Sequence, residues 1–300
     1  MTIMNFLVAF AVAFCGWALQ TSVSGITRKT VARMQKRYGP VWFQNFRDIF
    51  KLLSKRAITH GWVYDFGVIM ALAGIIGTAM FTPVAKIIAF QGYDNFFIFV
   101  YLFAVGMLGM AMSAVGSGNP LASIGVMRAL TQMVGYEVPF MIVIISLINV
   151  HSTSSISGLV DIQQATGWNI IVMPIGTIVG FVCLMGMLGK KPFDTYIAPA
   201  ELASGPMVEY GGKQLGMLMI MHEVATFVEI SLFVNLFLGG GSNILEFLIK
   251  YFLVYTLASY ISNVLGRFKI DQVVQFYYKV PIVLALIQAA MLIIFGWGVR

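Results

Sequence analysis

The residues of this chain that could move protons are concentrated in one polar loop and in the apolar segment that follows it. The loop spans residues 190–213 and lies between two segments long enough to cross a membrane. A charged acid at membrane depth costs about 2.5–3.5 kcal/mol on insertion scales, so such acids are usually functional. The pattern indicates a path for protons or cations; the alternative is a solvated loop beside two hydrogen-bonded acids. The loop acids are Asp194, Glu201 and Glu209, and those of the next segment are Glu223 and Glu229.

A second group of ionisable residues lies in the apolar segment 121–150. Arg128 and Glu137 are nine positions apart, about 180° around a helix, so they cannot pair with each other within it. Each therefore needs a partner from elsewhere or a water-filled cavity. Pro139 removes a backbone hydrogen bond close to Glu137, and the freed carbonyl can accept from water. We expect Glu137 to line a polar channel, with a structural arginine and a neutral glutamic acid as the alternative.

The apolar segment 214–239 combines a histidine with two acids. His222 and Glu229 are seven positions apart and lie on nearly the same face of a helix, whereas Glu223 points about 100° away. Buried carboxylic acids can exchange protons near neutral pH. The spacing therefore predicts one polar stripe through His222 and Glu229, with Glu223 on a neighbouring face.

Composition sets the class of protein that must position these groups. The 300 residues are 59% hydrophobic and 10% charged, against about 25% charged residues in a soluble domain. Only helices satisfy every backbone group within one lipid-exposed segment. We therefore expect an all-α polytopic membrane protein, with residues 1–300 forming a single integral membrane domain. Eight spans of about 20 residues are predicted, at 3–24, 62–88, 95–116, 121–150, 168–189, 214–239, 244–265 and 280–299.

The distribution of basic residues predicts the orientation in the membrane. If eight helices alternate, fifteen of the 19 lysines and arginines fall on one side. The positive-inside rule places that side in the cytoplasm and both termini outside. The net charge of +7 is thereby accounted for without a nucleic acid partner, although part of it could meet anionic lipid. The fifteen are the nine between Arg28 and Arg56, then Lys190, Lys191, Lys213, Arg267, Lys269 and Lys279.

Residues 26–60, between the first two spans, are predicted to form an amphipathic segment on the cytoplasmic side. Basic residues at helical spacing precede a break at Gly39-Pro40. Aromatic and aliphatic side chains then gather on one side of residues 43–53, with charged residues largely on the other. This pattern is typical of a helix lying in the membrane interface. It is either a simple anchor or a brace that also docks a soluble partner.

No cofactor site is expected in this chain. Cys15 and Cys183 both lie in apolar helices, without a CxxC partner or a nearby histidine. Of the three histidines, only His222 is deep in a helix, which argues against a bis-histidine haem. We expect no metal, disulfide or iron–sulfur site here, so any electrons must travel through another subunit.

Four blocks of this sequence are similar to those of a known protein family. The runs ARMQKRYGP, RALTQMVGYEVP, PFDTYIAPAELASGPMVEYGG followed by LFLGG, and GRFKIDQ occur in that order across nearly the whole chain. Together they resemble the complex I subunit 1 (H) family, which includes the membrane-anchor subunit of energy-converting (group 4) membrane-bound nickel–iron hydrogenases. The resemblance implies a subunit at the junction between a peripheral redox arm and antiporter-like, ion-translocating membrane subunits.

The resemblance also implies roles for particular residues. It places the five acids Glu137, Glu201, Glu209, Glu223 and Glu229 in or near the family's chain of acidic residues. Asp194 matches the family's PFD motif and Arg128 its R-A-x-x-Q-M motif. Docking of the peripheral arm is expected at the basic residues Arg33, Arg37, Lys190 and Lys191.

Departures from the family pattern favour one branch. In the quinone-reducing branch PFD is usually followed by Leu-Pro-Glu-Ala-Glu, whereas this chain has Thr195-Tyr196-Ile197-Ala198-Pro199. Val41 follows Gly39-Pro40 where complex I has an Asn. We therefore expect the anchor and proton-relay subunit of a ferredoxin-linked hydrogenase that evolves H2 at nickel–iron and iron–sulfur centres in partner subunits. The alternatives are a quinone-site subunit of a respiratory NADH dehydrogenase-type complex and the anchor of a related sulfur-reducing complex.

Overall fold

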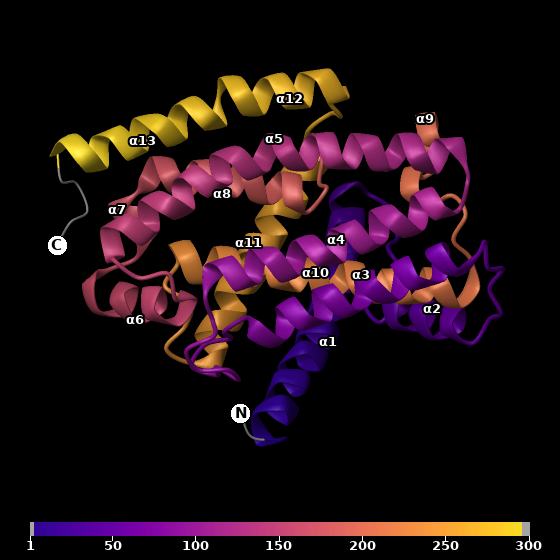
Figure 1. Cartoon of the computed structure of the whole chain (residues 1–300), viewed down its shortest axis with the longest axis horizontal. Helices are drawn as coiled ribbons and strands as arrows, with labels where there is room; N and C mark the ends of the chain where they lie inside the picture. The colour runs from indigo at the N-terminus through magenta and orange to yellow at the C-terminus, as the bar shows by residue number, and fades with distance from the viewer. Residues whose placement is uncertain (1–2, 296–300) are drawn as a thin grey trace. The chain divides into compact units, whose positions relative to one another are not determined.

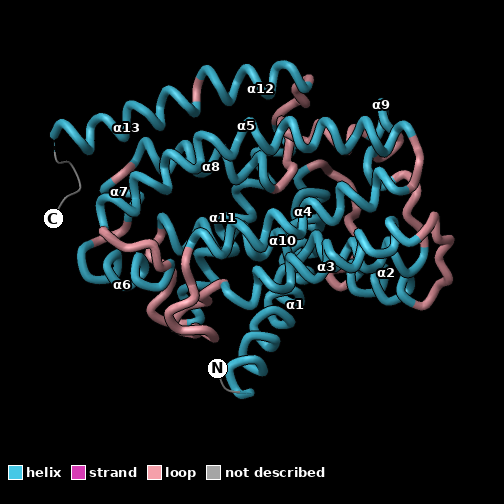
Figure 2. Tube along the Cα trace, in the orientation of Figure 1, coloured by secondary structure: helices cyan, strands magenta, loops and turns pink. Residues whose placement is uncertain are grey.

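Helices form the regular structure in residues 3–295, the part of the chain that the computed structural model describes (Figures 1 and 2). No β-strand occurs in this range. Seven of its helical spans are long and apolar enough to cross a membrane, and a shorter apolar helix covers Pro174–Met187. The predicted all-α, polytopic membrane fold is therefore confirmed.

Figure 1 labels the α-helices in chain order. The elements are α1 Ile3–Met34, α2 Gln44–Leu53, α3 Trp62–Phe81, α4 Phe96–Gly116, α5 Pro120–His151, α6 Ile156–Thr166, α7 Asn169–Val172, α8 Pro174–Met187, α9 Pro199–Leu202, the 3₁₀ helix η1 Gly205–Met207, α10 Gly212–Phe237, α11 Ile244–Val264, α12 Ile270–Lys279 and α13 Pro281–Phe295.

The chain divides into two compact units, whose boundaries fall inside α4, α5 and α10 and within the acidic loop. The first unit therefore holds the end of that loop, and the second unit its beginning. Unit 1 comprises residues 1–82, 98–127 and 196–228, and unit 2 comprises residues 83–97, 128–195 and 229–300.

In unit 1 the amphipathic helix α2 is fixed to α1. Asn45 at the start of α2 donates to Ser24 Oγ (3.2 Å) and accepts from Arg28. Ile49 is fully buried, while Phe50 is 60% exposed, as an interfacial helix with an outward aromatic face requires. The predicted amphipathic helix is thus present.

Small residues let α3 and α4 approach closely within unit 1. A Cβ atom added at Gly67 would lie 2.6 Å from the Ser113 backbone nitrogen, and one at Gly109 would lie 2.4 Å from the Ala71 nitrogen. Helices in lipid associate by such close backbone packing, because no hydrophobic force drives them together.

In unit 2, α13 packs on α8 and follows α12 end to end (Figure 1). The N-terminus of α6 is capped from the loop that precedes α4. Asp94 Oδ2 accepts from Ser155 Oγ (2.9 Å) and from the Ser157 backbone nitrogen (2.8 Å). Asp94 is 3% exposed, and its hydrogen bonds satisfy amide and hydroxyl groups at the helix start.

The structure corrects several predicted boundaries. The first span continues to Met34, ten residues past its apolar part, because basic residues at helical spacing extend it. The second ends at Phe81 instead of residue 88, since Pro83 cannot continue the helix. The fifth is broken at Met173, just before Pro174.

The last span differs most from its prediction at 280–299. Residues Ile270–Lys279 form a helix with Val273 and Tyr277 buried, so Lys279 ends α12 and does not lie in a loop. Pro281 then begins α13, whose predicted continuation at 296–299 lies outside the described residues.

Candidate functional site

The beginning of the acidic loop is held in unit 2 by an ion pair. Arg267 donates from Nε to Asp194 Oδ1 (2.8 Å) and from Nη2 to Asp194 Oδ2 (2.6 Å). This parallel, two-bond geometry is the strong form of a carboxylate–guanidinium contact. The Asp194 side chain is 12% exposed and that of Arg267 24%, so the pair is only partly screened by solvent.

A second bond joins the loop to α5. Thr195 Oγ1 donates to Gln132 Oε1 (2.7 Å), and Gln132 Nε2 donates to the Gly186 carbonyl (3.1 Å) at the end of α8. Gly186 is needed here, because an added Cβ would lie 2.3 Å from the Tyr277 hydroxyl oxygen. Three of the resembling sequence blocks, those with Gln132, Asp194 and Arg267, therefore meet in one hydrogen-bonded cluster.

The end of the acidic loop belongs to a cluster in unit 1, centred on Glu209. Asn119 Nδ2 donates to Glu209 Oε1, and His60 Nε2 lies 3.7 Å from Oε2. The Tyr64 hydroxyl donates to the Glu209 backbone carbonyl (3.3 Å). Both side-chain oxygens of Glu209 thus face groups that can donate a proton or a hydrogen bond.

A hydrogen-bond chain runs beside Glu209. The Tyr210 hydroxyl donates to Ser113 Oγ (2.7 Å), which donates to the Tyr64 carbonyl (2.7 Å), and the two tyrosine rings stack with centroids 4.9 Å apart. Burial raises the pKa of Tyr210 to about 12, against the opposing effect of its hydrogen bond with Ser113. The phenol therefore stays protonated at neutral pH and serves as a donor.

Glu201 lies in a strained part of the loop. It is exposed on the single turn α9, between three non-glycine residues with left-handed backbone: Ala198 (φ 26°), Ala203 (φ 49°) and Ser204 (φ 92°). Such conformations cost about 1–3 kcal/mol each and gather at functional and switching segments. Gly205, also left-handed, could hold no side chain, because its Cβ would lie 1.9 Å from the Tyr196 carbonyl oxygen.

The predicted acids of the membrane helices differ in burial. Glu229 in α10 is 6% exposed. Glu137 in α5 and Glu223 in α10 are half-buried, as is Arg128. His222 is exposed. The predicted stripe would therefore connect an exposed residue, His222, with a buried one, Glu229.

The predicted docking residues are mostly accessible. Arg33, Arg37 and Lys191 are exposed. Lys190 is half-buried, and its Nζ lies 4.9 Å from the centroid of the Tyr255 ring. This cation–π contact holds Lys190 against α11 in addition to any role in docking.

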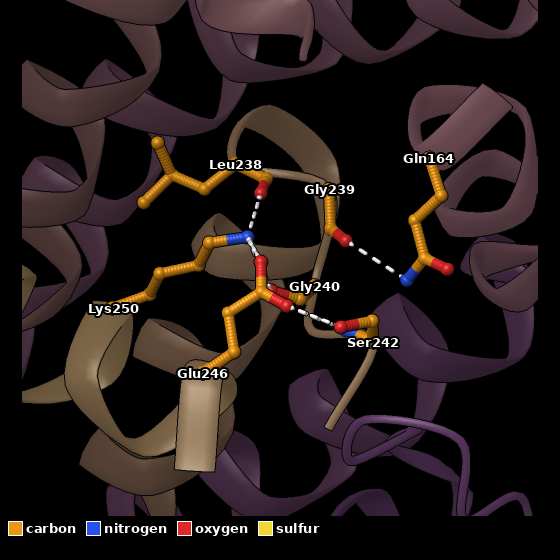
Figure 3. A network of polar contacts seen from close by, with 7 residues as sticks. All are labelled: Gln164, Leu238, Gly239, Gly240, Ser242, Glu246 and Lys250. Carbon is orange, nitrogen blue, oxygen red and sulfur yellow. Dashed lines mark hydrogen bonds and ion pairs between the residues drawn. The ribbon is translucent and has the colours of Figure 1, made fainter. Parts of the chain in front are cut away.

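One polar network of unit 2 was not predicted from the sequence (Figure 3). Lys250 in α11 is 7% exposed, and its Nζ lies 2.6 Å from Glu246 Oε1 and 4.2 Å from the centroid of the Trp168 ring. It also donates to the Leu238 carbonyl (2.7 Å) and the Gly240 carbonyl (3.0 Å). The network fixes the turn between α10 and α11. The i,i+4 spacing of Glu246 and Lys250 was its signal in the sequence.

Within residues 3–295, no three His, Cys, Asp or Glu side chains are grouped so that they could hold a metal ion.

The sequence of this chain is similar to known proteins along most of its length. A family model described as NADH dehydrogenase matches residues 4–293. One subunit of the F(420)H(2) dehydrogenase from Methanosarcina mazei is 29% identical over 300 residues, covering 88% of this chain and 85% of that protein. Hydrogenase-4 component C from Escherichia coli K12 is 30% identical over 285 residues, covering 88% of this chain and 89% of that protein.

A solved structure is also similar along nearly the full length. One chain of the membrane-bound sulfane sulfur reductase, an archaeal respiratory membrane complex, matches with a TM-score of 0.91 and 38% identity. The match covers 96% of this chain and 99% of that one. The resemblance drawn from the four sequence blocks is confirmed: the chain belongs to the NADH dehydrogenase family of membrane subunits, which complex I-like oxidoreductase complexes share.

Proposed function

We propose that this chain is the membrane-anchor subunit that couples a peripheral redox arm to ion translocation. The observation that carries the proposal is the burial of Glu229 inside α10, a candidate membrane span that begins where the acidic loop ends. A carboxylic acid at such a position is costly and calls for a function, and proton transfer is the chemistry that it performs best.

The loop is suited to carry a signal from the arm. Its beginning is fixed by Asp194 and Arg267 in one cluster, and its end by Glu209 and Asn119 in another. Between these anchors the backbone around Glu201 is strained. A charge that appears in a docked redox subunit would shift this segment and the hydrogen bonds of Glu209, which would change where a proton is held.

For the redox reaction we propose H2 evolution by a ferredoxin-linked hydrogenase. Two observations support it: the relative hydrogenase-4 component C, and the absence after Asp194 of the two acids usual in the quinone branch. The nickel–iron and iron–sulfur centres would lie in peripheral subunits docked at Arg33, Arg37, Lys190 and Lys191. The partners in the bilayer would be antiporter-like subunits, and the transported ion H+ or Na+.

Reduction of sulfur species is a second candidate reaction. It is favoured by the likeness to a chain of the sulfane sulfur reductase, which at 38% identity exceeds the 30% of the hydrogenase relative. Either reaction leaves the proposed coupling role of this chain unchanged, since the redox centres would lie in partners.

A single purification tests both the coupling role and the redox reaction. The complex is solubilised gently, its subunits are identified, nickel is measured, and reduced ferredoxin is offered with protons or with polysulfide as acceptor. Nickel with H2 evolution supports the hydrogenase; polysulfide reduction without nickel supports the alternative. A chain that purifies alone and transports a solute by itself would refute the coupling role.

A further inference from the structure

A groove of about 500 Å³ lies on the surface of unit 1, against the last part of α1. Most of the lining comes from one face of that helix, at positions spaced by three or four residues. The remaining wall is an aromatic side chain from the segment before α2. The lining residues are Ser22, Ile26, Lys29, Thr30, Arg33 and Trp42.

The two ends of the groove differ in chemistry. Lys29 and Arg33 place two cationic groups four residues apart at the end nearer the C-terminus of α1. Within the described part of the chain, neither forms an ion pair within 4.0 Å. Toward the middle of α1 the lining is Ile26 and Ser22, and the Ser22 hydroxyl already donates to the Ala18 carbonyl (2.8 Å). The groove therefore suits a molecule with an anionic head and an apolar tail.

The wall opposite α1 is built into the fold. A Cβ added at Gly25 would lie 1.8 Å from the Trp42 carbonyl oxygen, so only glycine allows this close approach. The hydrogen bonds that join Arg28 and Ser24 to Asn45 hold the start of α2, three residues after Trp42, against α1. Trp42 is 49% exposed and lines the groove, and an indole combines an apolar face with an N–H donor, as suits a ligand at the membrane interface.

We propose that this groove binds one anionic phospholipid. Lys29 and Arg33 hold its phosphate, the Trp42 indole N–H assists, and an acyl chain lies along Ile26. The occupant follows from the position of the groove: it flanks a membrane-spanning helix at the point where that helix becomes basic, and lipid is the amphipathic anion present there. The inference uses the membrane fold and is independent of the redox reaction. It assigns Arg33 to the lipid, so that docking of the peripheral arm would rest on Arg37, Lys190 and Lys191.

The test measures binding of phosphatidylglycerol to the intact complex in neutral detergent, where no anionic surface attracts it nonspecifically. Removing two surface ion pairs worth up to about 1 kcal/mol each predicts up to about 30-fold weaker binding in Lys29→Gln/Arg33→Gln. The matched control, Lys51→Gln/Lys55→Gln, removes the same charge at the same spacing from α2 and its end, and should bind like the wild type. Both control residues are exposed and lie outside the groove lining.

A third variant and two further ligands separate the lipid from other anions. Ile26→Trp fills the apolar end, leaves both charges and should also weaken phosphatidylglycerol binding. Phosphatidylcholine should bind far more weakly, and inorganic phosphate should not displace the lipid. Equal losses in the variant and the control, full displacement by phosphate, or normal binding in Ile26→Trp would each overturn the proposal. So would release of the peripheral subunits with unchanged lipid binding, which would make the groove a protein-docking surface.

Discussion

Four acids of the candidate site fall into two chemical situations. Asp194 and Glu209 have charged or hydrogen-bonding partners within their own unit, and they fix the two ends of the acidic loop. Glu137 and Glu229 lie in candidate membrane spans, with Glu229 almost fully buried. Acids of the first kind can serve as anchors as well as proton carriers, whereas those of the second are hard to explain by anchoring.

The anchoring role of Asp194 can be measured with a double-mutant cycle. Asp194→Asn and Arg267→Gln should each destabilise the complex by about 2–3 kcal/mol, because each leaves a partly buried charge without its bidentate partner. The double variant should lose much less than the sum, since it removes both charges. Thermal unfolding in detergent measures the cycle. Strict additivity would show that the pair contributes no coupling energy.

We expect Glu137 and Glu229 to carry the proton. The change Glu→Gln is nearly isosteric, so assembly should survive, while the exchangeable proton of the acid is lost. Ion translocation should fall about 10²-fold, the lower end of the usual effect of a proton-transfer group. The matched control is Asp161→Asn, at an exposed acid of α6, which should leave translocation unchanged. Equal translocation in Glu229→Gln, at equal assembly, would remove that residue from the path.

At the scale of elements, the cap of α6 couples one helix to pH. Burial opposes ionisation of Asp94, but the hydrogen bonds from Ser157 and Ser155 outweigh it and hold the pKa below the usual 3.8. The lowered pKa means that the cap stabilises the fold above pH 3.8 and that this contribution is lost as pH falls through the folded-state pKa.

Hydrogen exchange of the α6 amides tests the cap. Asp94→Ala should reduce protection by about 2 kcal/mol at neutral pH, because the hydrogen bonds to a charged acceptor are lost. The difference from wild type should shrink in acid, where Asp94 itself becomes protonated. Asp161→Ala, an exposed substitution on the same helix, should change little. A difference that stays constant down to acid pH would contradict the charge-based cap.

Helices set by hydropathy were predictable from the sequence, and those set by tertiary contact were not. The prediction at 121–150 matches α5 within one residue at each end. A long apolar segment in lipid forms a helix, because a helix satisfies all its backbone hydrogen bonds internally. Helix α12 was not predicted, since its Asp271, Gln272 and Lys279 are typical of a loop until Val273 and Tyr277 are seen to be buried. The break before α8 needed recognition of Pro174 as a helix start.

Some residues of the candidate site were likewise predictable from the sequence, and others were not. Acids at membrane depth, such as Glu229, can be found by residue type and hydropathy alone. The pairing of Asp194 with Arg267 joins residues 73 apart, and that of Asn119 with Glu209 residues 90 apart, so no local pattern could reveal either contact. Lys250 shows the opposite case, because its partner Glu246 lies only four residues away and the spacing alone could have indicated the pair.

At the scale of the whole molecule, the distribution of charge predicts the orientation in the membrane. Five of the fifteen basic residues lie inside candidate spans: Arg28, Lys29 and Arg33 in Ile3–Met34, Lys213 in Gly212–Phe237 and Lys279 in Ile270–Ile294. The other ten remain in loops on the predicted cytoplasmic side. This unequal distribution of basic residues predicts the orientation, since lysines and arginines in short loops favour the cytoplasmic side. The same orientation would direct the acidic loop toward a peripheral arm.

Two single cysteines test this orientation. Gln91→Cys lies in the loop before α4 and Lys55→Cys in the turn after α2, both at exposed positions. A membrane-impermeant maleimide should label Gln91→Cys in intact cells, and Lys55→Cys only after permeabilisation. The unmodified chain supplies the background, because Cys183 is buried and Cys15 lies within the apolar helix α1. The reverse pattern would place the basic loops outside, where a cytoplasmic ferredoxin-linked arm could not reach Glu209, and the proposed coupling would fail with it.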